Sequence, residues 1–124
     1  MGTLYLLLLL SQNGAGDINA SFVNSESLAR CEQSMLLVQR IFTSRDIPLL
    51  YRGCMLSPLR FTPFSHSDTS AVTRYHYLIS TDGDRFSVEP AANRAECMEK
   101  RVQRQGEGVY CATSTQQLRK QRTE

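Results

Sequence analysis

Four cysteines stand at corresponding points of two similar stretches of the chain. Residues 4–58 and residues 74–115 each have the pattern of a strand, a tight turn, a second strand, a helix and a third strand. In both stretches one cysteine falls in the expected helix and the next falls in the strand that follows it. The pattern predicts an α+β fold, in which an antiparallel or mixed sheet is built from two hairpin-helix-strand (ββαβ) units with both helices packed on one face.

These cysteines favour disulfides over a zinc site. They form an even set without a Cys-x-x-Cys pair, whereas zinc knuckles usually supply two closely spaced ligands. Proximity in the sequence favours pairing Cys31 with Cys54 and Cys97 with Cys111. Such bonds need an oxidising compartment. We therefore expect a periplasmic or secreted protein, and a cytoplasmic one if the thiols are reduced.

The length and composition fit one globular domain. Chains of 124 residues usually form a single core, and 41% hydrophobic with 21% charged residues is ordinary for a folded protein. Within this domain the sequence predicts a first unit (4–58), a linker (59–73), a second unit (74–115) and a basic tail (116–124).

The apolar run Leu4–Leu10 has two interpretations. It resembles the hydrophobic core of a secretory leader, which would be removed after residue 16 or 20, although no basic residue precedes it. Alternatively, it is a fully buried strand that ends at a turn containing Asn13-Gly14, a dipeptide typical of hairpins. The second stretch favours the strand, because residues 75–80 take the same place before an Asp82-Gly83 turn.

Residues 25–43 are predicted to form the first helix. Apolar side chains recur at steps of three and four residues, which places them on one helix face turned toward the sheet. This face contains Leu28, Cys31, Met35, Val38 and Phe42.

Residues 93–105 are predicted to form a second, shorter helix. Asn93 and Glu96 have the spacing of a capping box at its start. Its expected apolar stripe consists of Ala95, Met98 and Val102, so Cys97 would lie at the border of that stripe.

The predicted linker ends in the only local group of residues with catalytic or metal-binding side chains. His66 and Asp68 lie there, and His76 follows in the next expected strand. These three could form a hydrolytic or metal-dependent site, but none of them belongs to a recognised motif. A polar surface loop is the simpler interpretation, and we expect no cofactor.

Basic residues concentrate in the last quarter of the chain, although the net charge of +2 is too small to predict a nucleic-acid partner. They could form an anion-binding surface; a solvated helix face and tail is the simpler expectation. The candidates are Lys100, Arg101, Arg104, Arg119, Lys120 and Arg122.

Three functional hypotheses follow. The first is a small disulfide-stabilised, non-enzymatic interaction or structural protein with no membrane-spanning segment, which contacts a protein partner through an exposed strand edge or the basic second helix. The second is a small hydrolase or metal-dependent enzyme using His66, Asp68 and His76. The third is anion or nucleic-acid binding through the basic residues.

Overall fold

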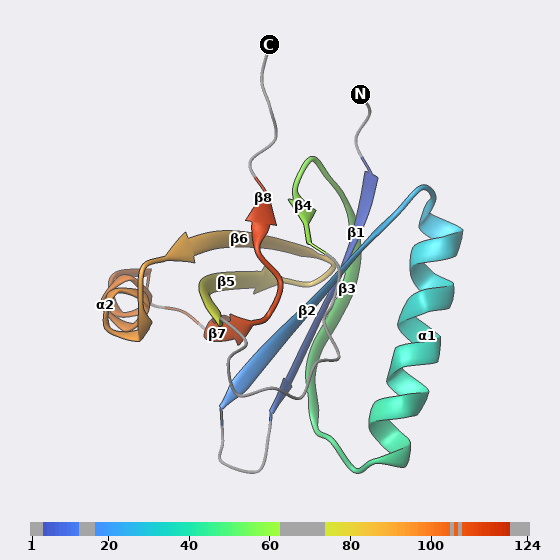
Figure 1. The fold of residues 1–124 in the computed structure, drawn as a ribbon, viewed down its shortest axis with the longest axis horizontal. Coiled ribbons are helices and arrows are strands. Elements are labelled where there is room, and N and C mark those ends of the chain that lie inside the picture. Colours follow the sequence, from blue (N-terminus) through green and yellow to red (C-terminus); the bar gives the residue numbers. More distant parts are fainter. Residues whose placement is uncertain (1–3, 13–16, 63–73, 105, 107, 120–124) are drawn as a thin grey trace.

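A computed structural model describes residues 4–12, 17–62, 74–104, 106 and 108–119, which form a strongly curled sheet and two helices (Figure 1). The elements in chain order are β1 (Leu4–Gln12), β2 (Ile18–Ser25), α1 (Leu28–Ser44), β3 (Leu49–Ser57), β4 (Arg60–Phe61), β5 (Tyr75–Asp82), β6 (Arg85–Ala91), α2 (Arg94–Arg104), β7 (Val109–Ser114) and β8 (Leu118–Arg119).

Six strands form the main sheet in the order β3-β1-β2-β7-β5-β6. Neighbouring strands are antiparallel except β2 and β7, which run parallel and meet where Asn19 lies opposite Thr113. The predicted α+β class with a mixed sheet is therefore confirmed. The sheet curls into a half-barrel, so its two faces have different surroundings.

The leucine run forms strand β1, which lies between β2 and β3. Residues Leu6 to Leu10 are at most 1% exposed. Alternate side chains of a strand point to opposite faces, and here Leu7 and Leu9 pack against α1 while the others pack inside the half-barrel. A continuous apolar run is therefore required, because both faces of this strand are buried.

The inner face of the half-barrel holds the largest apolar cluster. Strands from both halves of the chain, residues 4–58 and residues 74–115, contribute to it. Phe22 stacks on Phe61 with ring centroids 3.7 Å apart, and Tyr77 meets both rings edge-on. Phe61 belongs to β4, which pairs with β8 as a separate two-stranded ribbon. Residues 116–119 of the predicted tail are thus part of the folded structure, and residues 120–124 lie outside the described residues.

The two edge strands of the main sheet, β3 and β6, approach each other through side chains. The Tyr51 hydroxyl donates a hydrogen bond to the Gly83 carbonyl oxygen at 2.8 Å, and the Phe86 amide donates to the Met55 thioether at 3.3 Å. Gly83 has a φ of 62° in the tight turn predicted after Asp82. These contacts bring the edges of the half-barrel together without a strand ladder between them.

Helix α1 has defined signals at both ends. The Ser27 hydroxyl accepts a hydrogen bond from the Arg30 amide at its start. At its end, Asp46 takes a φ of 55°, and the Ile47 amide donates back to the Phe42 carbonyl oxygen. This is a Schellman-type end, in which the left-handed residue is an aspartate instead of the usual glycine.

Helix α2 begins with a variant of the predicted capping box, in which Glu96 caps the amide of Ala92 and not that of Asn93. The Asn93 side chain accepts from the Glu96 amide, and the Glu96 carboxylate accepts from the Ala92 amide, both at 2.8 Å. The predicted apolar stripe of this helix is wrong, because Val102 is 66% exposed and Cys97 is the buried residue. Both helices lie on the face of the sheet opposite the inner cluster.

Candidate interaction surface

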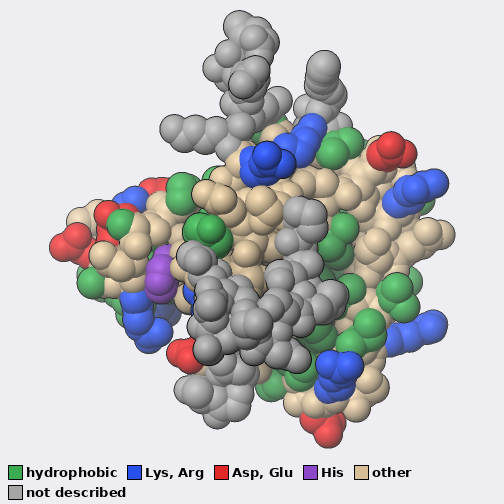
Figure 2. Space-filling view, in the orientation of Figure 1, with side chains coloured by type: hydrophobic (Ala, Val, Ile, Leu, Met, Phe, Trp, Pro, Cys, Tyr) green, Lys and Arg blue, Asp and Glu red, His purple; other side chains and the backbone are tan. Residues whose placement is uncertain are grey.

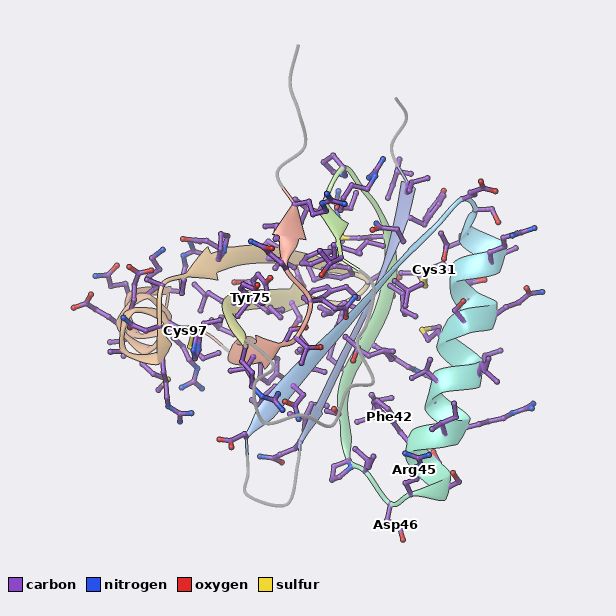
Figure 3. All side chains as sticks on the ribbon, viewed as in Figure 1. Cys31, Phe42, Arg45, Asp46, Tyr75 and Cys97 are labelled. Atoms are coloured by element: carbon purple, nitrogen blue, oxygen red, sulfur yellow. A yellow bond between two sulfur atoms is a disulfide. The ribbon has the colours of Figure 1, made fainter. Side chains whose placement is uncertain are left out.

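Disulfides attach both helices to the sheet. The structure contains Cys31–Cys54 and Cys97–Cys111, with Cα atoms 6.1 Å and 5.9 Å apart, which are the pairs expected from the sequence. Figure 3 shows Cys31 and Phe42 pointing from α1 toward the sheet. Each disulfide therefore ties a helix to a strand of its own half and fixes which face of that helix remains outside.

Most of the exposed large apolar side chains lie on α1 and the strands beside it. Among the described residues, eight large hydrophobic residues are exposed, and seven of them lie on α1 or on the adjoining strands β2 and β3. The remaining one is Val102 on α2. The seven are Val23, Leu28, Leu36, Leu37, Ile41, Leu50 and Leu56.

Two open depressions border this helix. The one on the β2 side is lined by Val23, Arg30 and Leu37 together with neighbouring polar residues. The one on the β3 side is lined by Leu36 and Arg40 of α1 and includes Arg52 of the edge strand. Figure 2 shows hydrophobic and basic side chains interspersed on the α1 side of the molecule. The surface formed by the outer side of α1 and these two borders is called the α1 surface below.

The Cys31–Cys54 disulfide and a side-chain hydrogen bond attach α1 to the edge strand beside it. Arg52 of β3 donates a hydrogen bond to the Gln39 side-chain oxygen of α1. Met35 and Val38 pack with Leu7 and Leu9 on the inner side of the helix. A surface that is ordered before binding loses little conformational entropy when a partner covers it.

The basic residues predicted for anion binding have different partners in the structure. Lys100 and Arg104 both contact the Glu89 carboxylate, and the Lys100 contact measures 2.9 Å. Arg101 donates to the Val109 carbonyl oxygen at 2.9 Å, and Arg119 lies exposed in β8. Lys120 and Arg122 lie outside the described residues.

The ion pairs around Glu89 change its titration. The hydrogen bond from Lys100 and then that from Arg104 lower the pKa of Glu89, and the same carboxylate raises the pKa of Lys100. The positive charge on this side of α2 is therefore partly neutralised within the molecule. Anion binding by these residues remains a prediction, and a ligand there would compete with Glu89.

The weak catalytic candidates are only partly described. His76 lies in β5, where its backbone is opposite Thr113 of β7, whereas His66 and Asp68 lie outside the described residues. Within the described part of the chain, no cluster of His, Cys, Asp or Glu has the arrangement of a metal site. The hypothesis of a site formed by His66, Asp68 and His76 therefore stays a prediction.

The α1 surface was missed from the sequence, although a signal was present. The predicted inner stripe left Leu36, Leu37 and Ile41 unassigned, and all three are at least 43% exposed. A helix with strong apolar residues outside its buried stripe has more apolar surface than one sheet can cover. That excess marks the outer face of α1 as the candidate site.

Comparisons with protein-family models, curated proteins and solved structures found no match to this chain. Its two described helices are both too short or too polar to cross a lipid bilayer.

Proposed function

We propose that this protein is a small, disulfide-stabilised, non-enzymatic protein that binds another protein molecule through the α1 surface. The observation that carries the proposal is the concentration of exposed apolar residues on α1 and its adjoining strands, against a single one on α2. Exposed apolar groups that gather in one place, unlike scattered ones, are typical of interaction sites.

The energetics support a protein partner. Burying an exposed leucine contributes about 1 to 2 kcal/mol before the costs of association are subtracted. Leu36 and Leu37 are 55% and 60% exposed, so both have much of this surface left to bury. The arginines beside them would form the polar rim that usually surrounds an apolar interface centre.

A photo-crosslinking amino acid tests the proposal in the cells that produce the protein. It is placed at Leu37 and, as a matched control, at Val102, which is similarly exposed on the other helix. We expect a discrete protein adduct from position 37 that is absent from position 102. The proposal fails if position 37 gives no adduct, or if both positions give the same ones.

We also propose that the protein folds in an oxidising compartment, in accordance with its two disulfides. Each bond closes a loop of moderate length and is expected to contribute about 3 kcal/mol, a large share of the net stability of a small domain. Alkylation of the protein as it is made in its source measures this directly. Free thiols on the native protein would refute an oxidising location.

We further propose that the two halves are copies of one ββαβ unit. Each half contributes three adjacent strands, in the order β3-β1-β2 and β7-β5-β6. In both halves the first strand lies in the middle, and the third strand lies on the same side of it. Each half also has a disulfide from its helix to its third strand. The halves differ in helix length. Homologues whose two halves resemble each other no more than unrelated sequences do would contradict a common ancestry.

A further inference from the structure

One stripe of exposed residues runs along α1 on the side away from the sheet. Its members recur at steps of three and four positions, so they share one face of the helix. Leu36 stands at the centre of the stripe and is 55% exposed. The complete stripe is Ala29, Glu32, Leu36, Arg40 and Thr43, and all five are exposed.

The stripe is self-complementary about Leu36. Glu32 and Arg40 lie at equal distances along the helix on either side of it, and they carry opposite charges. Ala29 and Thr43 lie one further turn out, also at equal distances, and both are small. When two such helices meet antiparallel, a residue on one side of the centre faces its counterpart on the other copy.

We propose that α1 packs antiparallel against α1 of a second copy of this chain, with the two-fold axis beside Leu36. The two Leu36 side chains then meet at the axis. Glu32 of each copy faces Arg40 of the other, which forms two symmetry-related ion pairs. Ala29 faces Thr43 of the other copy, and these small side chains allow the helices to approach closely.

Charge complementarity identifies a second copy as the occupant. Neither Glu32 nor Arg40 takes part in an ion pair within the described residues. The residues four positions away from them on the same helix face are uncharged: Leu28, Leu36 and Ser44. A two-fold interface needs a surface that is complementary to itself, and the Glu32–Arg40 spacing supplies that property.

The size of the helix sets the expected affinity. Its 17 residues extend about 25 Å, and one helix pair of this length buries an area at the low end of stable interfaces. We therefore expect a reversible dimer with a dissociation constant in the micromolar range. Leu36 also lines the depression that includes Arg52, so the edge strand β3 would lie beside the helix pair.

Sedimentation equilibrium of two charge-reversal variants tests the proposal. Glu32→Arg places Arg against Arg40 of the other copy, and Arg40→Glu places Glu against Glu32. Each variant alone should dimerise at least about tenfold more weakly than the wild type, because two attractive pairs become repulsive. An equimolar mixture of the two should recover the dimer, because every pair in the heterodimer is again of opposite charge.

The double variant Glu32→Arg/Arg40→Glu provides a second measurement and should dimerise within about threefold of the wild type. Arg45→Glu, an exposed reversal outside the stripe, is the matched control and should leave dimerisation nearly unchanged. Circular dichroism and non-reducing mass spectrometry check that each variant keeps its fold and disulfides. A monomeric wild type, or a mixture as weak as the single variants, would overturn the proposal.

This inference rests on the proposed function, since it names the partner of the same surface, but the two can fail separately. If photo-crosslinking from position 37 yields a different protein and the wild type sediments as a monomer, the α1 surface binds a partner other than itself. If position 37 yields no adduct at all, the proposed function fails, whereas the dimer is still decided by sedimentation, because Leu37 lies about 100° around the helix from the Leu36 stripe.

Discussion

The side-chain amide of Gln116 pairs with both backbone polar groups of Phe22, which precedes it by 94 positions. Its oxygen accepts from the Phe22 amide at 2.8 Å, and its nitrogen donates to the Phe22 carbonyl oxygen at 2.7 Å. Gln116 is 1% exposed and also donates to the Thr62 carbonyl oxygen. At Phe22 the strands β2 and β7 are no longer paired. The Gln116 side chain therefore makes the hydrogen bonds to Phe22 that a neighbouring strand would otherwise make.

Tyr77 completes this network from the other side. Its hydroxyl donates to the Gln116 carbonyl oxygen at 2.7 Å and accepts from the Leu118 amide at 2.8 Å. Burial is the main cause of the raised pKa of Tyr77, so the phenol remains a donor across the ordinary pH range. The network holds residues 116–118 against the open side of the half-barrel.

Replacing Gln116 with leucine should destabilise the protein by at least about 2 kcal/mol, because it leaves the amide and carbonyl groups of Phe22 buried without partners. Urea unfolding followed by circular dichroism measures the change. Gln117→Leu is the control, since Gln117 is exposed and should change stability by less than about 0.5 kcal/mol. Equal effects at the two positions would contradict the role of the Gln116 amide.

Glu89→Gln should lower stability at neutral pH by about 0.5 to 1 kcal/mol, because Lys100 and Arg104 lose a partly exposed carboxylate partner. The pKa of Glu89 is depressed below its ordinary value of 4.5. Its contribution is therefore present above that value and is lost as the pH falls through the lowered pKa. Urea unfolding at a series of pH values measures the difference between the two proteins.

The stability difference between the wild type and Glu89→Gln should shrink on acidification. Glu99→Gln is a suitable control, because Glu99 is exposed and joins no ion pair among the described residues. A difference that stays constant or grows toward acid pH would show that the ion pairs at Glu89 do not contribute as described.

A chain that begins at Asp17 should not unfold cooperatively. It lacks β1, the strand that separates β2 from β3 and supplies Leu6 to Leu10 to two apolar clusters. Thermal unfolding followed by near-ultraviolet circular dichroism should show one transition for the full chain and none for the truncated one. A truncated chain that keeps the cooperative transition would mean that the first strand is dispensable, as expected if it served as a leader.

Asp46→Gly should stabilise the protein by about 0.5 to 1 kcal/mol. Asp46 has a φ of 55°, which glycine adopts without strain, and its negative charge is unfavourable at the end of a helix. Asp46→Ala removes the charge and keeps the strained conformation, so it separates the two causes. If alanine stabilises the protein as much as glycine does, the positive φ of residue 46 does not reduce the stability, and the charge of Asp46 is the cause.

The local structure of α1 could be predicted because its signals are close in sequence. The predicted inner positions Cys31, Met35 and Val38 do pack toward the sheet, and Ser27 precedes them as a cap. The prediction was wrong for Leu28, which is 42% exposed in the first turn. In α2 the same reasoning failed, since Cys97 alone is buried and the stripe through Val102 is exposed. A short helix fixed by one disulfide needs little apolar surface, so its apolar pattern carries little information.

The long-range features could not be predicted from the sequence. Nothing near Gln116 distinguishes it from the neighbouring polar residues, and its partner Phe22 is 94 positions away. The parallel contact between β2 and β7 at Asn19 and Thr113 depends on the curl of the whole sheet. The α1 surface was partly predictable. The sequence shows that α1 has leucines outside its inner stripe, but it does not show that these leucines stay exposed in the folded protein.

Each helix is joined by a disulfide to the strand that follows it in the chain. Tryptic digestion under non-reducing conditions, followed by mass spectrometry, tests it directly, because arginine and lysine residues place the four cysteines in four separate peptides. We predict that peptide 31–40 is linked to peptide 53–60, and peptide 95–100 to peptide 105–119. A crosslink between peptides of different halves, or four free thiols in the native protein, would contradict it.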